Sequence, residues 1–311
     1  MRLRDKFQSC GEIESMQESR RFREELVLKK QIDRGMAVFA FVTIAFLVIC
    51  SMMYYITKSP TYLTLLMFTP AISVIISKLI CKEKINDLYL KPRFKNNAKW
   101  YICSYFLTPF IALFGTLIYF LIFKDDFNPL GSRYAIEAGI VNTKDYVSSL
   151  LVLIPLAILV NPIMGILQCL GEELAWRSYL LPRLSKRYSI RSAVLINGVI
   201  WGIWHSPIIA MGYNYGNDHP FLGILAMILF CMIIGIISSY LFYKTESVWC
   251  SVLFHASING MDKWAPSSMF MSEDANKFIG PDLLGIIGGI GFVVIASIAF
   301  LRLREIKEYR E

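Results

Sequence analysis

The sequence predicts an all-α fold, a polytopic bundle of membrane-spanning helices. Hydrophobic residues make up 55% of the chain and charged residues only 18%, against about 25% charged in soluble domains. The mean hydropathy is +0.50. The charges also avoid long stretches of chain, and an uncharged apolar run of about 18 residues can cross the hydrocarbon layer as a helix. The chain is therefore expected to lie largely within a lipid bilayer.

Eight apolar runs are the expected transmembrane spans. The seventh is short and carries His255, so we expect it inside the bundle, where protein surrounds it and polar atoms find partners. In chain order the runs are 36–57, 59–77, 101–123, 146–169, 192–213, 221–243, 247–261 and 283–301.

Lys and Arg residues are distributed unevenly between the two sides of these spans. With eight spans both termini lie on one side, and the segments of that side carry 25 Lys and Arg residues against six in the opposite loops. Positively charged loops are retained on the cytoplasmic side, so both termini are expected there. The net charge of +8 is then explained by topology and anionic lipid headgroups, without invoking nucleic acid.

The chain is expected to form one membrane domain, because it contains no internal repeat and no linker long enough to separate two folded domains. Residues 1–35 form a charged cytoplasmic N-terminal segment, residues 36–301 the membrane domain and residues 302–311 a cytoplasmic tail. The seven cysteines contain no CxxC pair, so neither a disulfide framework nor a cysteine zinc site is expected.

The fourth run contains the dipeptide Asn161-Pro162. Asn before Pro is a good helix start, since Pro is tolerated at the first helical position. We therefore expect a break here, with 146–160 as a separate half-span. A helix that begins at Pro162 places Glu172 roughly 15 Å along its axis, near the middle of the membrane.

Glu172 and Glu173 form the first polar cluster within the spans, together with Arg177. Glu173 and Arg177 are four residues apart and can pair along one helix face, whereas Glu172 points about 100° away. One carboxylate is then held in a salt bridge and the other is free for chemistry. Alternatively, both glutamates mark the end of the helix at the headgroups.

His205 lies in the middle of the fifth span, four residues after Trp201 and two before Pro207. Because Pro207 cannot donate to the carbonyl of Ile203, the helix is expected to bend near His205. By itself, such a histidine is as well explained by a hydrogen bond between helices. His219 lies in the outer turn between spans five and six, where a loop role suffices.

His255 and Asn259 form the third cluster, in the seventh span. They are four residues apart and share a helix face, so an imidazole and an amide could hold one ligand, water or transition state. Together, the three clusters place one carboxylate, two imidazoles and one amide on three different spans. Ionisable groups inside a bilayer are costly and are functional candidates by default.

The three clusters resemble the signature of the CPBP family of intramembrane proteases, which includes the type II CAAX prenyl endopeptidases and bacteriocin-processing or self-immunity proteins. The family pattern is EExxxR, an aromatic-xxx-His element and HxxxN. Two residues depart from it, since Trp201 stands where Phe is usual and Ser178 stands where Gly is common. Residues Glu172, Glu173, Arg177, Trp201, His205, His255 and Asn259 match the pattern in order.

The resemblance implies an endopeptidase that cuts near the cytoplasmic side of the membrane. Glu172 and His205 would activate a water molecule, and His255 and Asn259 would stabilise the oxyanion, while Glu173 with Arg177 would orient Glu172. A carboxylate in a poorly hydrated site can accept a proton near neutral pH. The partners implied are the lipid bilayer and a peptide or membrane-associated protein substrate, lipidated or not, in the plasma membrane of a bacterium.

Whether a metal takes part is left open by the sequence. Glu172, His205 and His255 could ligate zinc or another divalent ion and leave a position for water. There is no HExxH helix, and with Glu172 as general base only two imidazoles remain as strong ligands, which favours a metal-free reaction. Two other functions use the same residues or the N-terminal segment: an ion- or proton-coupled transporter and a non-catalytic membrane scaffold.

Overall fold

Helices make up all the regular secondary structure in the described part of the chain. The computed structural model describes residues 30, 33–262, 264–272 and 275–306. Most of the charged N-terminal segment 1–35 and the end of the tail 302–311 lie outside these residues. The predicted all-α class is confirmed for the part that is described.

Six helices are long and apolar enough to cross a membrane. They confirm a multi-pass membrane protein, although eight spans are not established. The seventh and eighth expected spans form shorter helices, α11 (Val248–Asp262) and α13 (Ile290–Arg302). The six long helices are Asp33–Thr57, Thr61–Ile80 (α2), Ala98–Ile122 (α3), Thr143–Met164 (which contains α5 and α6), Ile190–Ala210 (α9) and Pro220–Thr245 (α10).

Short helical segments connect the long helices. The segment that carries the glutamate pair is built from α7 (Ile166–Glu173), a π-helical stretch (Leu174–Leu180) and α8 (Leu181–Ser185). The others are α4 (Arg133–Glu137), α12 (Pro266–Phe270) and the 3₁₀ turns Lys124–Asp126, Pro129–Gly131 and Leu303–Glu305.

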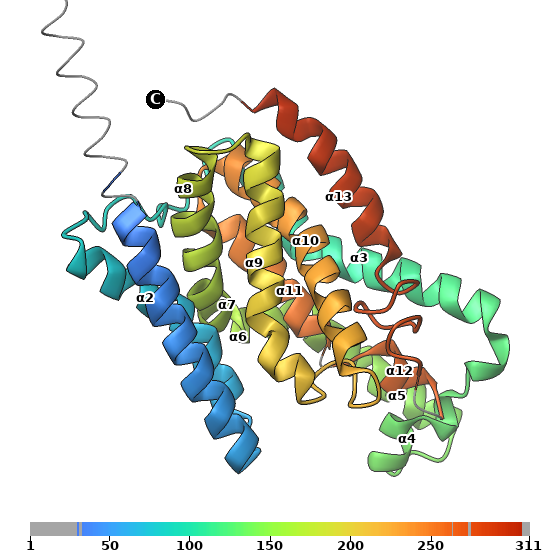
Figure 1. The fold of residues 1–311 in the computed structure, drawn as a ribbon. Helices are drawn as coiled ribbons and strands as arrows, with labels where there is room; N and C mark the ends of the chain where they lie inside the picture. Colours follow the sequence, from blue (N-terminus) through green and yellow to red (C-terminus); the bar gives the residue numbers. More distant parts are fainter. Residues whose placement is uncertain (1–29, 31–32, 263, 273–274, 307–311) are drawn as a thin grey trace, which may run out of the picture.

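The centre of the bundle is formed by α7, α9, α10 and α11, with α2 on one flank and α3 and α13 on the other (Figure 1). Ten of the fifteen residues of α11 are buried. The expectation that the seventh run lies inside the bundle is therefore confirmed, because protein surrounds this short helix on most of its faces.

Helix α9 approaches α10 closely at two glycines, Gly198 and Gly202. A Cβ atom at Gly202 would lie 2.5 Å from the Cα of Ile228, and one at Gly198 would lie 2.8 Å from the Cα of Met232. Small residues four apart are the usual way for membrane helices to pack backbone against backbone. This contact fixes the position of α9, which carries Trp201 and His205.

The fourth run does not break at Asn161-Pro162, contrary to the sequence-based expectation. The helix continues from Thr143 to Met164 through a π-helical segment, Leu156–Val160. The Asn161 side chain does not cap a helix but donates to the carbonyl of Gly260 in α11, at 3.2 Å. A π-helical turn widens the backbone ladder and so accommodates the missing N–H of Pro162.

The break occurs at Gly165 instead. In Figure 1, α5 and α6 run across the lower part of the molecule, whereas α7 turns upward from Gly165. Glu172 therefore lies about 9 Å along the new helix. This is a shorter distance than the roughly 15 Å expected from a helix start at Pro162.

The start of the eighth run was also predicted too early. Residues 283–289 are turns, and α13 begins only at Ile290. The glycines explain the difference, since a Cβ atom at Gly288 would lie 2.0 Å from the carbonyl oxygen of Asp282. The backbone folds back on itself here, which a helix could not do.

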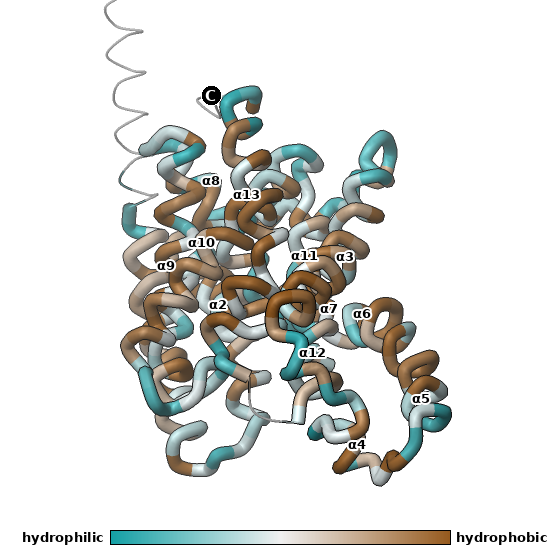
Figure 2. The backbone as a smooth tube through the Cα atoms, turned by 90° about the vertical axis from the view of Figure 1, so that its right-hand side faces the viewer, coloured by the Kyte–Doolittle hydropathy of each residue, from teal (hydrophilic) through white to brown (hydrophobic). Residues whose placement is uncertain are grey.

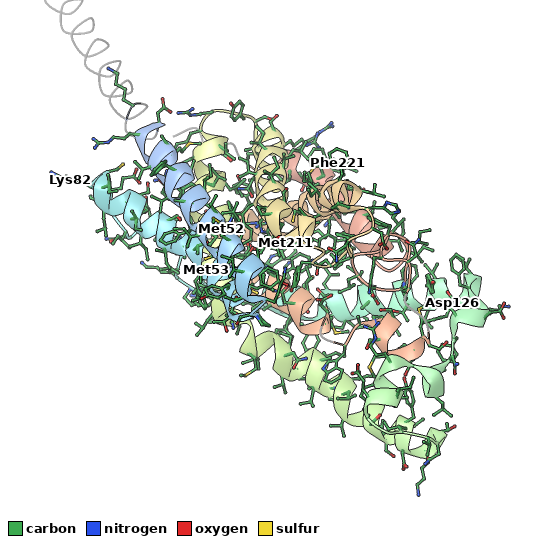
Figure 3. The ribbon with its side chains drawn as sticks, turned by 60° about the horizontal axis from the view of Figure 1, so that its bottom comes forward. Met52, Met53, Lys82, Asp126, Met211 and Phe221 are labelled. Atoms are coloured by element: carbon green, nitrogen blue, oxygen red, sulfur yellow. The ribbon has the colours of Figure 1, made fainter. Side chains whose placement is uncertain are left out.

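Both ends of the bundle are hydrophilic. At the upper end in Figure 1, the loop 81–97 meets the start of α11, where the N–H of Val248 donates to the carbonyl of Tyr89 and Arg93 pairs with Glu246. Figure 2 shows hydrophilic segments at the ends of the tube and hydrophobic ones between them. Figure 3 turns the lower end toward the viewer, with Met52, Met53 and Met211 on it.

Candidate active site

Glu172 and Glu173 end α7 in the interior of the bundle. Glu172 is 2% exposed and Glu173 fully buried. Consecutive residues on a helix point about 100° apart, and the two carboxylates accordingly have different partners. Burial of both excludes the alternative that they mark a helix end at the headgroups.

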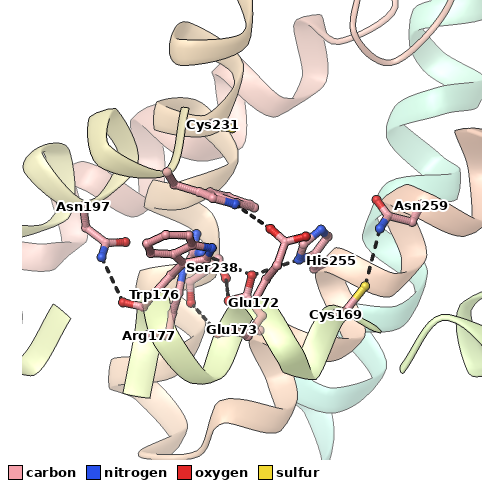
Figure 4. A network of polar contacts seen from close by, with 12 residues as sticks. Cys169, Glu172, Glu173, Trp176, Arg177, Asn197, Cys231, Ser238, His255 and Asn259 are labelled. Atoms are coloured by element: carbon pink, nitrogen blue, oxygen red, sulfur yellow. Dashed lines mark hydrogen bonds and ion pairs between the residues drawn. The ribbon is translucent and has the colours of Figure 1, made fainter. Parts of the chain in front are cut away.

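Glu173 is the centre of a buried polar network (Figure 4). Its Oε1 atom accepts from Nη1 of Arg177 at 3.1 Å and lies 3.0 Å from Nδ1 of His255. Its Oε2 atom accepts from the hydroxyl of Ser238 at 3.2 Å. The predicted Glu173–Arg177 pair is confirmed. Glu173 orients His255 as well, a contact that the sequence did not suggest.

Arg177 is fully buried between this network and an aromatic ring. Its guanidinium carbon lies 4.3 Å from the centre of the Trp201 ring, a cation–π geometry. Among the described residues, its Nε and Nη2 atoms have no hydrogen-bond partner. Breaking a buried ion pair leaves an uncompensated charge, so Glu173 and Arg177 depend on each other.

Glu172 is held by Trp201 rather than by Glu173 and Arg177. The indole Nε1–H of Trp201 donates to Oε2 of Glu172 at 2.8 Å. The carboxylate is thus fixed through one oxygen, and the other oxygen is left for a further ligand. Arg177 lies against the ring of this same Trp201, and the expectation that the ion pair orients Glu172 stays a prediction.

His205 is anchored to its own helix. Its Nδ1 atom lies 2.9 Å from the carbonyl oxygen of Trp201. Since a carbonyl can only accept, Nδ1 carries the proton and Nε2 is the free nitrogen. Pro207 does not end the helix, since α9 continues through it to Ala210.

His255 and Asn259 lie on the same face of α11, as predicted. The Nδ1 atom of His255 is held by Glu173, which again leaves Nε2 free. The amide of Asn259 donates to Sγ of Cys169 at 3.5 Å. Thiol sulfur is a weak acceptor, so the amide can exchange this partner for a ligand at small cost.

One cavity of about 250 Å³ brings the four predicted residues together. Its wall is otherwise mostly apolar, with Asn214 and Asp262 as further polar members. His219 lies in the turn before α10 and is not part of the wall. Glu172, His205, His255 and Asn259 all line this cavity, as do Trp201, Trp204, Leu63, Leu66, Met67, Ile208, Tyr213, Met227, Phe230, Cys231, Ile234, Ile258, Leu283 and Leu284.

Three contributors to the site were missed from the sequence. Ser238 of α10 bonds Glu173, Cys231 of α10 lies 3.7 Å from Nδ1 of His205, and Trp201 donates an N–H. The motif identifies Trp201 only as an aromatic residue. A serine pair, Ser238-Ser239, in an otherwise apolar span was the available signal for Ser238, because polar groups in a span seek partners.

The same side chains are candidate metal ligands. Glu172, His205 and His255 have suitable chemistry, and both histidines have Nδ1 fixed by an oxygen, as zinc-bound histidines do. Among the described residues, however, no three His, Cys, Asp or Glu side chains are grouped closely enough to hold an ion. As arranged, these residues do not fit a three-ligand metal centre.

Comparisons with known proteins indicate the class of protein, an intramembrane protease. Residues 148–261, which contain all three motifs, match the family described as type II CAAX prenyl endopeptidase Rce1-like. Over 223 residues the chain is 27% identical to CAAX prenyl protease 2 of Methanococcus maripaludis, covering 66% of this chain and 75% of that protein. Both comparisons confirm the resemblance found in the motifs, and neither favours a transporter or a scaffold.

Proposed function

We propose that this intramembrane endopeptidase hydrolyses a peptide bond of its substrate with Glu172 as general base. One observation carries the proposal: Glu172, His205, His255 and Asn259, from three separate helices, line a single cavity. A buried carboxylate with one oxygen free, beside imidazoles with a free Nε2, is suited to proton transfer.

In the proposed first step, water bound between Glu172 and Nε2 of His205 loses a proton to Glu172. Its oxygen attacks the carbonyl carbon of the peptide bond, and the carbonyl oxygen takes up the negative charge. The indole N–H of Trp201 keeps the carboxylate in one orientation. A fixed base and a fixed water lower the entropy cost of the attack.

The charge on the carbonyl oxygen would be stabilised by two donors on α11. The amide N–H of Asn259 is one donor, and Nε2–H of a doubly protonated His255 is the other. Glu173 faces Nδ1 of His255, so a carboxylate supports the imidazolium in the way a buried acid supports a catalytic histidine.

In the last step the C–N bond breaks. Glu172 returns the proton to the leaving amine, so one water is consumed and a carboxyl and an amino terminus are formed. Glu172 thus acts first as base and then as acid, and the site returns to its starting protonation state.

The substrate is a peptide or protein with an apolar stretch at the bond that is cut. The largely apolar cavity wall supports this choice, and a lipid attached to the substrate is compatible with it. The relative is named for prenylated substrates, and prenylation here is an extension of that name. The plasma membrane of a bacterium stays our prediction for the location.

The test compares protein termini in membranes of cells that carry the parent chain or Glu172→Gln. We expect a set of new termini that the variant fails to produce, because Gln cannot accept the proton from water. Glu137→Gln changes an exposed glutamate of α4 in the same way and serves as the control that retains processing. Equal termini in parent and Glu172→Gln cells would refute the proposal.

A further inference from the structure

Within the described part of the chain, the exposed residues that line the proposed catalytic cavity lie toward one end of the bundle. Its exposed lining residues are Tyr213, which is 42% exposed, Asn259 and Asp262. Tyr213 lies in the turn after α9, and Asp262 is the last residue of α11. The α2 residue Leu63, near the start of that helix, also lines the cavity. The end of α9, the end of α11 and the start of α2 all lie at the lower end in Figure 1.

Toward the opposite end of the bundle, buried side chains pack closely and leave no opening among the described residues. Every residue of the π-helical stretch Leu174–Leu180, which continues α7 upward from the glutamates, is buried. Trp176 is 1% exposed and Tyr179 fully buried. The network of Glu173, Arg177 and Ser238 occupies the space between this stretch and α10. No lining residue of the cavity belongs to the loops of the upper end.

The closed end is the basic end. The upper loop 81–97 alone carries Lys82, Lys84, Lys91, Arg93 and Lys95, whereas the turn 211–219 at the mouth carries Asp218 and no Lys or Arg. Short loops rich in Lys and Arg are retained in the cytoplasm. The mouth of the cavity then faces the other side of the membrane.

We propose that the enzyme takes its substrate from the non-cytoplasmic side, as a polypeptide segment that has been exported or is exposed at the outer surface. This inference rests on the function proposed above. It replaces the sequence-based expectation of a cut near the cytoplasmic side, which needs a mouth at the basic end. The scissile bond enters between α2, the turn 211–219 and the end of α11, and meets Glu172 at the closed bottom of the cavity.

Cysteine accessibility in membrane vesicles tests the sidedness. Tyr213→Cys and Leu63→Cys place a thiol at two separate positions on the cavity wall, and Lys186→Cys places one on the exposed loop of the basic end. Each is treated with a membrane-impermeant, charged methanethiosulfonate reagent in right-side-out and in inverted vesicles. The parent chain, with its seven native cysteines, gives the baseline.

We expect Tyr213→Cys and Leu63→Cys to gain labelling over the baseline only in right-side-out vesicles, and Lys186→Cys only in inverted vesicles. Labelling of the cavity positions from the inverted side overturns the proposal, as does failure of both to label in either preparation while Lys186→Cys labels. If one cavity variant fails to accumulate, the other carries the test.

The labelling does not depend on catalysis, so the two proposals fail separately. If Glu172→Gln leaves processing intact while the labelling has the expected sidedness, the catalytic proposal is wrong and the sidedness stands. If Glu172→Gln abolishes processing but the cavity labels from the inverted side, the catalytic proposal stands and only the access route is wrong.

Discussion

Trp201 contributes three separate contacts to the site. Its indole N–H donates to Glu172, its carbonyl accepts from His205, and its ring carries the guanidinium of Arg177. A phenylalanine at this position, the usual residue of the family that the motifs resemble, would keep the carbonyl and the ring but not the N–H. The indole N–H is therefore a positioning group that a phenylalanine could not supply.

Trp201→Phe tests this role at the level of one hydrogen bond. A hydrogen bond to a charged group contributes about 1.5–3 kcal/mol, so we expect kcat to fall about tenfold or more while KM changes little, because the base loses its orientation but the cavity keeps its shape. Steady-state cleavage of a peptide spanning a processed site measures both constants.

Trp204→Phe is the matched control for this substitution. Trp204 lines the same cavity, but its indole N–H has no hydrogen-bond partner among the described residues. The same change there should have a smaller effect on kcat. Equal losses in the two variants would show that the ring volume, and not the donor, accounts for the effect.

At the level of elements, the contact between α9 and α10 positions the site. Gly198 and Gly202 allow the two backbones to meet, which brings Cys231 of α10 beside His205. Ser178, which stands where the family commonly has Gly, is buried with a hydroxyl that has no partner among the described residues. The close approach between α9 and α10 is made at Gly198 and Gly202 instead.

Gly202→Ala should therefore destabilise the fold. The new methyl would lie 2.5 Å from the Cα of Ile228, and because backbone cannot rotate away, α9 and α10 must separate. Overpacking of this kind typically costs about 1–3 kcal/mol. Thermal unfolding of the purified protein in detergent measures the loss. Gly165→Ala is the control, since its nearest atoms are 3.7 Å away, and an equally large loss there would contradict the explanation.

At the scale of the whole molecule, the interior of the bundle contains two regions, an open cavity and a closely packed polar network. Below the glutamates lies the cavity, and above them the network of Glu173, Arg177 and Ser238 is enclosed by packed aromatic residues. The access route proposed for the substrate would also bring water to Glu172 from the cavity side.

Chelation tests whether the intact enzyme needs a metal ion for cleavage. Because the described donors do not group into a three-ligand site, we expect cleavage to persist after prolonged dialysis against a strong chelator, to within about twofold of the untreated enzyme. The measurement is the rate of peptide cleavage before and after dialysis, with metal content followed in parallel. Loss of activity that added zinc restores would reassign Glu172, His205 and His255 as ligands.

The sequence by itself determined the features that depend on composition and on neighbours along one helix. The apolar runs defined the membrane class, and the four-residue spacing of Glu173 and Arg177 was sufficient for their ion pair, since such residues face each other on any helix. The spacing of His255 and Asn259 likewise placed both on one face of α11. The motif order identified all four residues of the proposed catalytic set.

Only the tertiary structure decided what depends on segments far apart in the chain. The fourth run breaks at Gly165 and not at Asn161, whose side chain bonds the carbonyl of Gly260, about a hundred residues away. Glu173 meets Ser238 and His255, and Glu172 meets Trp201, through packing of separate helices. The direction in which the cavity opens follows from which helix ends are filled, a property of the whole bundle that no local pattern encodes.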